Sequence, residues 1–213
     1  MPDLEYEYAA VERGDVQSLS LVIGIDEAGR GPLAGPVSAA AVILPAGFSN
    51  DLLDDSKKLS EKKRDSIYDD IMSDENLLWG HSYAEVDEID SINILKATHA
   101  AMARAVDQLV KKLDDKQVYC LIDGLAVKNF PYRSEGIVKG DGKSLSIAAA
   151  SIIAKVKRDR KMLEYAEKFP EYGFERHKGY GTKVHLAALQ EYGPTKIHRK
   201  SFSPVAQLSL PLE

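Results

Sequence analysis

The sequence predicts an α/β domain built around a mixed β-sheet. Short apolar runs suited to buried strands are interspersed with longer segments of helical periodicity, in an order that differs from the regular alternation of a Rossmann array. The chain has 213 residues, enough for one well-buried domain with a small appendage. Its content of 44% hydrophobic and 29% charged residues is that of an ordinary soluble globular protein.

Five runs of residues predict the strands. The first two are joined by a bend rich in glycine and proline, which suggests a hairpin-like pair. The third alternates polar and apolar residues, the fourth is continuously apolar, and the fifth is short. The expected strands cover residues 21–25, 37–44, 77–86, 117–122 and 136–139.

Four segments predict helices by their apolar periodicity and by the residues at their starts. Ser60 is expected to cap the first, and Asp90 or Ser91 the second. The third begins almost wholly apolar, so its first half should be buried against the sheet while its charged second half projects outward. Residues 1–17 are polar and predict either a frayed extension or a short helix. The expected helices cover residues 60–73, 92–112, 144 or 146 to 169, and 182–192.

Acidic residues stand at or just beyond the ends of three expected strands. Asp26 and Glu27 follow the first strand, Asp123 the fourth and Asp141 the fifth. Neighbouring carboxylates repel each other and are costly to desolvate, and a divalent cation such as Mg²⁺ or Mn²⁺ is the usual compensation. If these strands are neighbours, four carboxylates meet at one edge of the sheet, but periodicity alone leaves that adjacency open. The alternative for the first pair is a strand-ending turn with solvated acids.

The bend after the first strand is rich in glycine. Gly29, Gly31 and Gly35 lack the G-x-G-x-x-G spacing of a dinucleotide loop, and a strand rather than a helix is expected to follow them. Glycine lets the backbone approach a ligand closely or adopt a positive φ. The bend therefore favours a ligand contact and excludes a Rossmann site.

The distribution of charge indicates which kind of partner the protein binds, and its cysteine content indicates the compartment. The net charge is −5, yet residues 139–200 hold half of the 28 Lys and Arg residues, twice the number of Asp and Glu there. An acidic sector beside a basic one fits carboxylates that face a polyanion, although a mixed solvated surface gives the same count. Cys120 is the only cysteine, and no apolar run approaches the roughly 20 residues that cross a membrane, so a cytoplasmic protein is expected.

Four motifs carry a resemblance to a known family. The stretches GIDEAGRGPLAGPV, LIDG, VKGDGKSLSIAAASIIAKVKRDR and HKGYGT follow one another over residues 20–204 and together resemble ribonuclease HII. The resemblance implies the ribonuclease H-like fold, a five-stranded mixed sheet flanked by helices, with a helical C-terminal part. It also implies hydrolysis of the RNA strand of RNA–DNA hybrids and cleavage 5′ to ribonucleotides embedded in duplex DNA, with a role in ribonucleotide removal.

The resemblance assigns the catalytic and metal-binding roles to Asp26, Glu27, Asp123 and Asp141. Asp159 is a rival for the fourth place, but its charged helical surroundings favour a solvated salt bridge with an adjacent residue. The implied chemistry uses two ions, Mg²⁺ or Mn²⁺, with substrate bound, and leaves 3′-hydroxyl and 5′-phosphate ends. The 5 histidines form no evident pair with the acids and are expected to be structural or to lie near phosphates.

Residues of the substrate interface are also implied by the resemblance. The backbone of Gly29, Arg30 and Gly31 is expected to contact the ribose 2′-hydroxyl, and Tyr180 to pack on the sugar. The alternative for Tyr180 is a loop aromatic that fills a surface groove. Candidate phosphate contacts, which position a duplex without specifying its sequence, are Lys57, Lys58, Asn93, Lys143, Ser144 and Lys178.

The two ends of the chain complete the prediction. Residues 1–17 are expected to be an N-terminal extension, 18–203 the catalytic domain and 204–213 a tail. The tail segment from Gln207 to Leu212 resembles peptides that bind the bacterial sliding clamp, although Glu213 departs from their usual hydrophobic end.

Arg30 and the short N-terminal extension favour ribonuclease HII over the related ribonuclease HIII, and a monomer is expected. The rival hypotheses are a duplex-binding module without chemistry and a different ribonuclease H-like nuclease.

Overall fold

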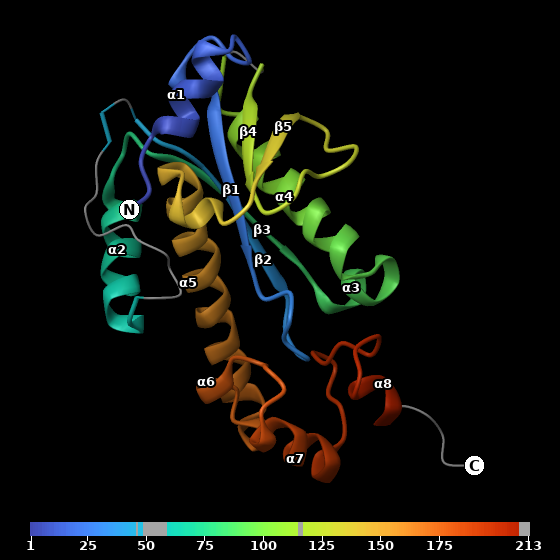
Figure 1. Ribbon diagram of the computed structural model, residues 1–213. Helices are drawn as coiled ribbons and strands as arrows, with labels where there is room; N and C mark the ends of the chain where they lie inside the picture. The colour runs from blue at the N-terminus through green and yellow to red at the C-terminus, as the bar shows by residue number, and fades with distance from the viewer. Residues whose placement is uncertain (46, 49–58, 115–116, 209–213) are drawn as a thin grey trace.

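The fold is a five-stranded mixed sheet with helices on both faces, in a computed structural model that describes residues 1–45, 47–48, 59–114 and 117–208 (Figure 1). The strand order is β3-β2-β1-β4-β5. The β1–β2 and β2–β3 pairs are antiparallel, whereas the β1–β4 and β4–β5 pairs are parallel. The predicted mixed sheet of five strands is therefore confirmed. The strands are β1 (Val22–Ala28), β2 (Val37–Ile43), β3 (Leu78–Ala84), β4 (Tyr119–Asp123) and β5 (Arg133–Ile137).

Two long helices cover opposite faces of the sheet. Helix α4 (Ile94–Val110) packs on one face, and α5 (Leu145–Lys168) packs on the other beside α2 (Glu61–Ser73) (Figure 1). Successive residues of β2 point to opposite faces, so Ala39 contributes to the core on the α4 side and Ala40 to the core on the α5 side. Burial on both faces explains why every residue of β2 except Ser38 is apolar.

The helix predicted over residues 92–112 is present as α4, but it begins two residues later than predicted, and a separate short helix precedes it. Helix α3 (Val86–Ile92) ends at Asn93, whose φ of 72° breaks the helical path before α4 begins. The cap of α4 is also Asn93, which accepts from the Leu95 and Lys96 amides, and not Asp90 or Ser91 as predicted. The fifth strand begins and ends a few residues earlier than predicted, at Arg133 and Ile137.

The N-terminal segment is anchored to the start of α5. It forms α1 (Glu5–Glu12), and the side chain of Glu7 is buried against the first turn of α5. Glu7 Oε1 accepts from Ser144 Oγ at 2.6 Å, and from the Ser146 amide at 3.0 Å and hydroxyl at 2.6 Å. The short-helix alternative is therefore confirmed and the frayed one is wrong. A 3₁₀ turn (Leu19–Leu21) connects this helix to β1.

The C-terminal lobe, residues 170–208, extends beyond the sheet at the far end of α5 (Figure 1). Its elements are a 3₁₀ turn (Pro170–Tyr172), α6 (Phe174–His177), α7 (Lys183–Tyr192) and α8 (Val205–Leu208). It has its own small core, which takes in Leu33 and Ala34 from the bend between β1 and β2. The predicted helical C-terminal part is confirmed. Among the described helices, none is long and apolar enough to span a membrane.

Candidate active site

The four predicted acids lie on adjacent elements, which we call the acid edge: Asp26, Glu27, Asp123 and Asp141. In the parallel β1–β4 pair, Ile25 is opposite Ile122, so Asp26 and Asp123 are the next residues along neighbouring strands. Asp141 lies in a 3₁₀ turn (Gly140–Gly142) shortly after β5, and the Gly140 amide donates to Asp123 Oδ1 at 2.6 Å. The adjacency that periodicity left open is therefore present, with β4 between the other two acid-bearing strands.

Asp26 carries the strongest electrostatic signal of the acid edge. Its side chain is buried, and its pKa is raised well above the usual range by that burial and by the charges of Glu27 and Asp123. Hydrogen bonds from the Ser151 side chain and from the Glu27 amide, at 2.7 Å, act in the opposite direction and lower the pKa. A cation bound here would relieve the repulsion, and carboxylate oxygens are the ligands that Mg²⁺ and Mn²⁺ prefer.

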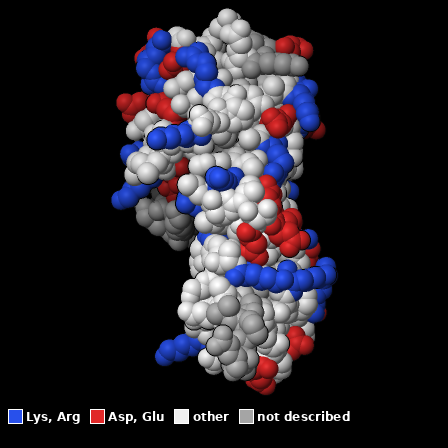
Figure 2. All heavy atoms as spheres, turned by 90° about the vertical axis from the view of Figure 1, so that its right-hand side faces the viewer, with Lys and Arg blue, Asp and Glu red and all other residues white. Residues whose placement is uncertain are grey.

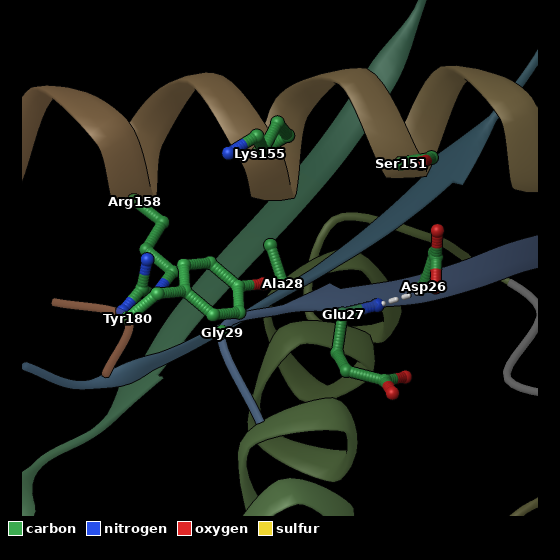
Figure 3. A pocket seen from close by; sticks show the side chains of 8 residues that line it. All are labelled: Asp26, Glu27, Ala28, Gly29, Ser151, Lys155, Arg158 and Tyr180. Atoms are coloured by element: carbon green, nitrogen blue, oxygen red, sulfur yellow. Dashed lines mark hydrogen bonds between the residues drawn. The ribbon is translucent and has the colours of Figure 1, made fainter. Parts of the chain in front are cut away.

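Glu27 points away from Asp26, toward α4 (Figure 3). Its carboxylate accepts from Arg30 Nη1 at 3.2 Å, an ion pair in which the Arg30 side chain is half exposed. Within the described ranges, no three Asp, Glu, His or Cys side chains are grouped closely enough to hold an ion. The oxygen ligands therefore suit a divalent cation, but enclosing one requires side-chain rotation, which for Glu27 means leaving Arg30.

Glu27 also lies between two cavities. The smaller, of about 150 Å³, contains Tyr180 and extends along α5 past Lys155 (Figure 3). The larger, of about 560 Å³, lies on the α4 side and combines Asp123, Arg30 and His99 with an apolar wall. The acid edge is thus open to space on both sides. The smaller cavity is lined by Asp26, Glu27, Ala28, Gly29, Ser151, Lys155, Arg158 and Tyr180.

The glycine loop, residues 29–36, contains glycines with different roles. Gly29 has a φ of +94°, and a Cβ there would overlap the Arg158 side chain; Gly35 has a φ of +83°, and a Cβ would overlap the Met162 sulfur. At Gly31 a Cβ would meet only a ring atom of Tyr180, at 3.6 Å, which is an ordinary contact. The fold therefore requires Gly29 and Gly35, whereas it leaves room for a larger residue at position 31.

The predicted substrate contacts fall into different environments. Tyr180 is 49% exposed and lines the smaller cavity, while Lys143 is exposed on the turn that follows Asp141. Ser144 is fully buried, and its hydroxyl donates to Glu7 and accepts from the Ile147 amide, so its placement argues against a phosphate contact.

The other candidate phosphate contacts are engaged within the protein or lie outside the described residues. Lys178 Nζ donates to the Glu175 carbonyl at 2.6 Å. Asn93 is exposed but uses its oxygen as the α4 cap, and Lys57 and Lys58 lie outside the described residues.

Two buried arginines beneath the glycine loop were missed by the sequence interpretation. Arg158 is 1% exposed and Arg199 is 0% exposed. Both lie in basic stretches, KVKRDR and HRK, where a charged side chain is ordinarily expected to be solvated. The same reasoning fails for Asp159, which is buried and pairs with Lys155 at 2.8 Å, one turn away, and not with an adjacent residue in solvent. Nothing in the local pattern signals this burial.

Three histidines of the C-terminal lobe support the segment that carries Tyr180. His198 Nδ1 accepts from the Thr195 amide, so its Nε2 carries the proton and donates to His185 Nε2 at 3.0 Å. His185 then carries its proton on Nδ1 and donates to the Tyr180 carbonyl at 2.9 Å. His177 accepts from the Gly179 amide in the same segment. These histidines are structural, as expected, whereas His99 lines the larger cavity beside Glu27 and Asp123.

The charge asymmetry of the sequence does not appear as an acidic half and a basic half on the face seen in Figure 2. On the face seen in Figure 2, basic and acidic side chains are interspersed. On that face the surface is the mixed one that the sequence left open as an alternative. Positive side chains also line the two cavities beside the acid edge, Lys155 and Arg158 in the smaller and Arg30 and Lys128 in the larger.

Comparisons with known proteins agree with this arrangement. The family model described as Ribonuclease HII matches residues 23–205. A ribonuclease HII of Coxiella burnetii is 52% identical over 190 residues, which cover 89% of this chain and 92% of that protein. A ribonuclease HII of Acholeplasma laidlawii is 48% identical over 206 residues, 97% of this chain and 96% of the relative.

Solved structures share the fold at lower sequence identity. A complex of PCNA and RNase HII from Archaeoglobus fulgidus contains a chain with a TM-score of 0.68 and 24% identity, covering 86% of this chain and 95% of that chain. Bst-RNase HIII in complex with Mn²⁺ has a TM-score of 0.69 at 18% identity, covering 91% of this chain and 71% of that chain. Similarity at this level supports the ribonuclease H-like fold, and the sequence matches establish the family. The chain belongs to the ribonuclease HII family and is a ribonuclease H hydrolase.

Proposed function

We propose that this protein hydrolyses the RNA strand of RNA–DNA hybrids and cuts 5′ to ribonucleotides embedded in duplex DNA, so that these can be removed. The observation that carries the proposal is the position of the glycine loop, which continues directly from the strand that bears Asp26 and Glu27. Chemistry and sugar recognition would then be two to five residues apart along the chain. The cytoplasm is the proposed compartment, from the absence of a disulfide partner for Cys120.

The acid edge would bind Mg²⁺ or Mn²⁺, two ions when substrate is present. Asp26 and Asp123 would hold the ions from neighbouring strands, with Glu27 and Asp141 completing the set. When bound, such ions lower the pKa of a water that attacks phosphorus in line and stabilise the departing 3′ oxygen. The raised pKa of Asp26 supports this assignment, because repelling carboxylates are a cost that a bound cation offsets. The ribonuclease HIII relative in complex with Mn²⁺ supports it further.

This chain's own residues would position the substrate. Ser151 and the Glu27 amide hydrogen-bond to Asp26 and so hold its carboxylate in place. The Arg30 guanidinium, now paired with Glu27, would transfer to a phosphate of the substrate and free Glu27 to turn toward an ion. Backbone groups of Gly29–Gly31 would contact the ribose 2′-hydroxyl, and Tyr180 would pack on the sugar. The contact of the Gly29–Gly31 backbone with the 2′-hydroxyl is supported by Gly31, where the fold leaves room for a larger residue.

One assay tests the activity and its two rivals. The substrate is a DNA duplex that contains a single ribonucleotide, incubated with and without Mg²⁺. The expected result is cleavage at the ribonucleotide only when metal is present. Binding without cleavage would favour a duplex-binding module, and equal cutting of an all-DNA duplex would favour a different ribonuclease H-like nuclease.

We further propose that the tail binds the sliding clamp. Gln207 and Leu208 lie in α8, and the remainder of the peptide, residues 209–212, lies outside the described part of the chain. Leu208 is 42% exposed and so is accessible to a partner. The Archaeoglobus relative in complex with PCNA supports the proposal. A truncation that ends at Ala206 should lose affinity for the clamp in a calorimetric titration; unchanged affinity would contradict the proposal.

A further inference from the structure

The Arg199 guanidinium is buried completely and is bonded to backbone carbonyls of the glycine loop. Its Nη2 donates to the Gly29 carbonyl at 2.6 Å, and its Nη1 to the Arg30 carbonyl at 2.8 Å. Its Nε and Nη2 both donate to the Gly35 carbonyl, at 3.0 and 2.8 Å. One side chain of the C-terminal lobe thus fixes three carbonyls of a loop that precedes it by more than 160 residues.

Arg199 has no salt bridge in the described part of the chain to offset its burial, although the charge of Asp90 acts on it in the direction that raises its pKa. Among the described residues, neither Arg199 nor Arg158 forms an ion pair, and Arg158 likewise donates to carbonyls, those of Ala34, Pro36 and Lys178. Burial and the nearby charge of Arg158 lower the pKa of Arg199 to about 9. Well-packed apolar side chains commonly give equal or greater stability than buried charges. Two cations kept beneath one loop therefore indicate a requirement for geometry more than for stability.

The geometry that Arg199 imposes follows from the planar trans peptide. In such a peptide the C=O of one residue and the N–H of the next point in opposite directions. Holding the Gly29 and Arg30 carbonyls on Arg199 therefore turns the N–H groups of Arg30 and Gly31 away from it. Neither amide donates to another residue in the part of the chain that the structure describes. Two adjacent donors are left for a ligand, beside Gly31, which is the glycine of this loop where a Cβ would overlap nothing.

We infer that Arg199 is the positioning residue for ribose selectivity: it fixes the glycine loop so that the Arg30 and Gly31 amides meet the substrate's 2′ oxygen. This inference rests on the proposed function and adds to it a residue that does not touch the substrate. The forked guanidinium is essential, because a lysine ammonium is a compact point charge and lacks the planar fork. The lobe's other links to the loop, such as the Arg199 amide to the Leu33 carbonyl at 2.9 Å, remain when the side chain is changed.

The test measures binding selectivity in a cleavage-silent background, the Asp26→Asn variant. Its dissociation constants are measured for a duplex with one ribonucleotide and for the same duplex in all-DNA form. Adding Arg199→Lys should reduce the preference for the ribonucleotide duplex by about tenfold, the value of one or two hydrogen bonds. Affinity for the all-DNA duplex should change much less, because the loop contributes one proposed phosphate contact, Arg30, whereas Lys143 and Lys178 lie outside it.

A matched control separates positioning from stability. Leu189→Ala removes a buried side chain from the core of the same lobe without removing a donor to the glycine loop. It should lower the Tm and leave the selectivity ratio unchanged. Arg199→Gln serves as a second variant, because it removes the buried charge and still lacks the fork, so it should fold even where the lysine variant does not.

Each outcome assigns Arg199 a role. A lost preference in Arg199→Lys or Arg199→Gln with an unchanged ratio in Leu189→Ala supports the inference. A folded Arg199 variant that keeps the parent's preference overturns it while the proposed function stands. Unfolding of both variants also overturns it, since Arg199 then serves stability. A parent that shows no preference for the ribonucleotide duplex overturns the proposed function and this inference together.

Discussion

The acid edge and the glycine loop are adjacent along β1, yet they are held in place by different means. Asp26 and Asp123 owe their positions to the register of two neighbouring parallel strands. The glycine loop owes its shape to side chains from α5 and from the C-terminal lobe, chiefly Arg158 and Arg199. The difference suggests that the sheet supplies the chemistry and that remote parts of the chain supply the selectivity.

The largest effect is expected at the acid edge. Asp26→Asn should reduce kcat by about 10⁴-fold, a typical loss for a residue of the catalytic set. Binding of the ribonucleotide duplex should be largely preserved, because Asp26 is not a phosphate contact. Steady-state kinetics and a binding titration measure the two quantities. Loss of binding with retained turnover would reverse the assignment of chemistry to this edge.

Asp26→Asn should also stabilise the metal-free protein. The folded pKa of Asp26 is raised, so its ionisation costs stability above that pKa, and wild-type stability should rise as pH falls through it. The variant should therefore unfold at a higher temperature than wild type at neutral pH in a chelating buffer. An equal or lower Tm would indicate that Asp26 is already compensated by its neighbours.

The second effect distinguishes Gly29 from Gly31 in the glycine loop. Gly31→Ala should keep the wild-type Tm and lose about 10²-fold in kcat/KM on a ribonucleotide duplex, since the methyl group would occupy space meant for the sugar. Gly29→Ala should instead cost about 1–3 kcal/mol of stability, because it combines a positive φ with an overlap on Arg158. Thermal unfolding and kinetics on both variants make the comparison. Equal Tm losses would show that the fold needs both glycines.

A smaller effect is expected at the residue between these glycines. Arg30→Ala should lower kcat/KM by about tenfold at most, because the 2′-hydroxyl contact is assigned to backbone and the side chain is half exposed. Gly31→Val should be the more damaging change of the two. If the ranking is reversed in parallel assays, the ribose contact belongs to the Arg30 side chain.

The smallest effect at neutral pH concerns the lobe. Burial and the charge of His185 lower the pKa of His198 in the folded protein to about 4, from an ordinary value near 6.5. Between these two pH values the unfolded chain binds a proton that the folded protein does not, so protonation favours unfolding. Stability should fall by about 2 kcal/mol as pH decreases from 6.5 to 4. Denaturant unfolding across this range, with His198→Gln as the control, measures the change. An equal slope in wild type and control would place the acid sensitivity elsewhere.

The sequence predicted what depends on local pattern and neighbouring strands. Ser60 caps α2 as predicted, and the helices expected to start at residues 144 or 146 and 182 are capped by Ser144 and Thr182. The acids were found because costly carboxylates at strand ends are visible in the sequence. The ribonuclease H-like fold and the family followed from motifs in order, a resemblance that the comparisons confirm.

The features that the sequence did not predict mostly depend on contacts between distant segments. The start of α4 was missed even though Asn93 is a residue type that favours N-caps and tolerates a positive φ, because Asp90 and Ser91 offered competing caps nearby. Ser144 was predicted on a phosphate, but Glu7 from the first helix occupies its hydroxyl. Arg199 belongs to a basic stretch, and only the folded chain shows that its partners are carbonyls near the other end. A role that depends on contact between two distant segments cannot be predicted from the sequence of either segment alone.

The central claim is that metals bound at the acid edge cut beside a ribose that the glycine loop recognises. The most direct measurement maps the ends formed from a DNA duplex that contains one ribonucleotide, in the presence of Mg²⁺. The account predicts a single cut on the 5′ side of the ribonucleotide, with a 3′-hydroxyl on one product and a 5′-phosphate on the other. A 2′,3′-cyclic phosphate would contradict it, because the 2′-hydroxyl would then be the nucleophile and not the group that the loop recognises.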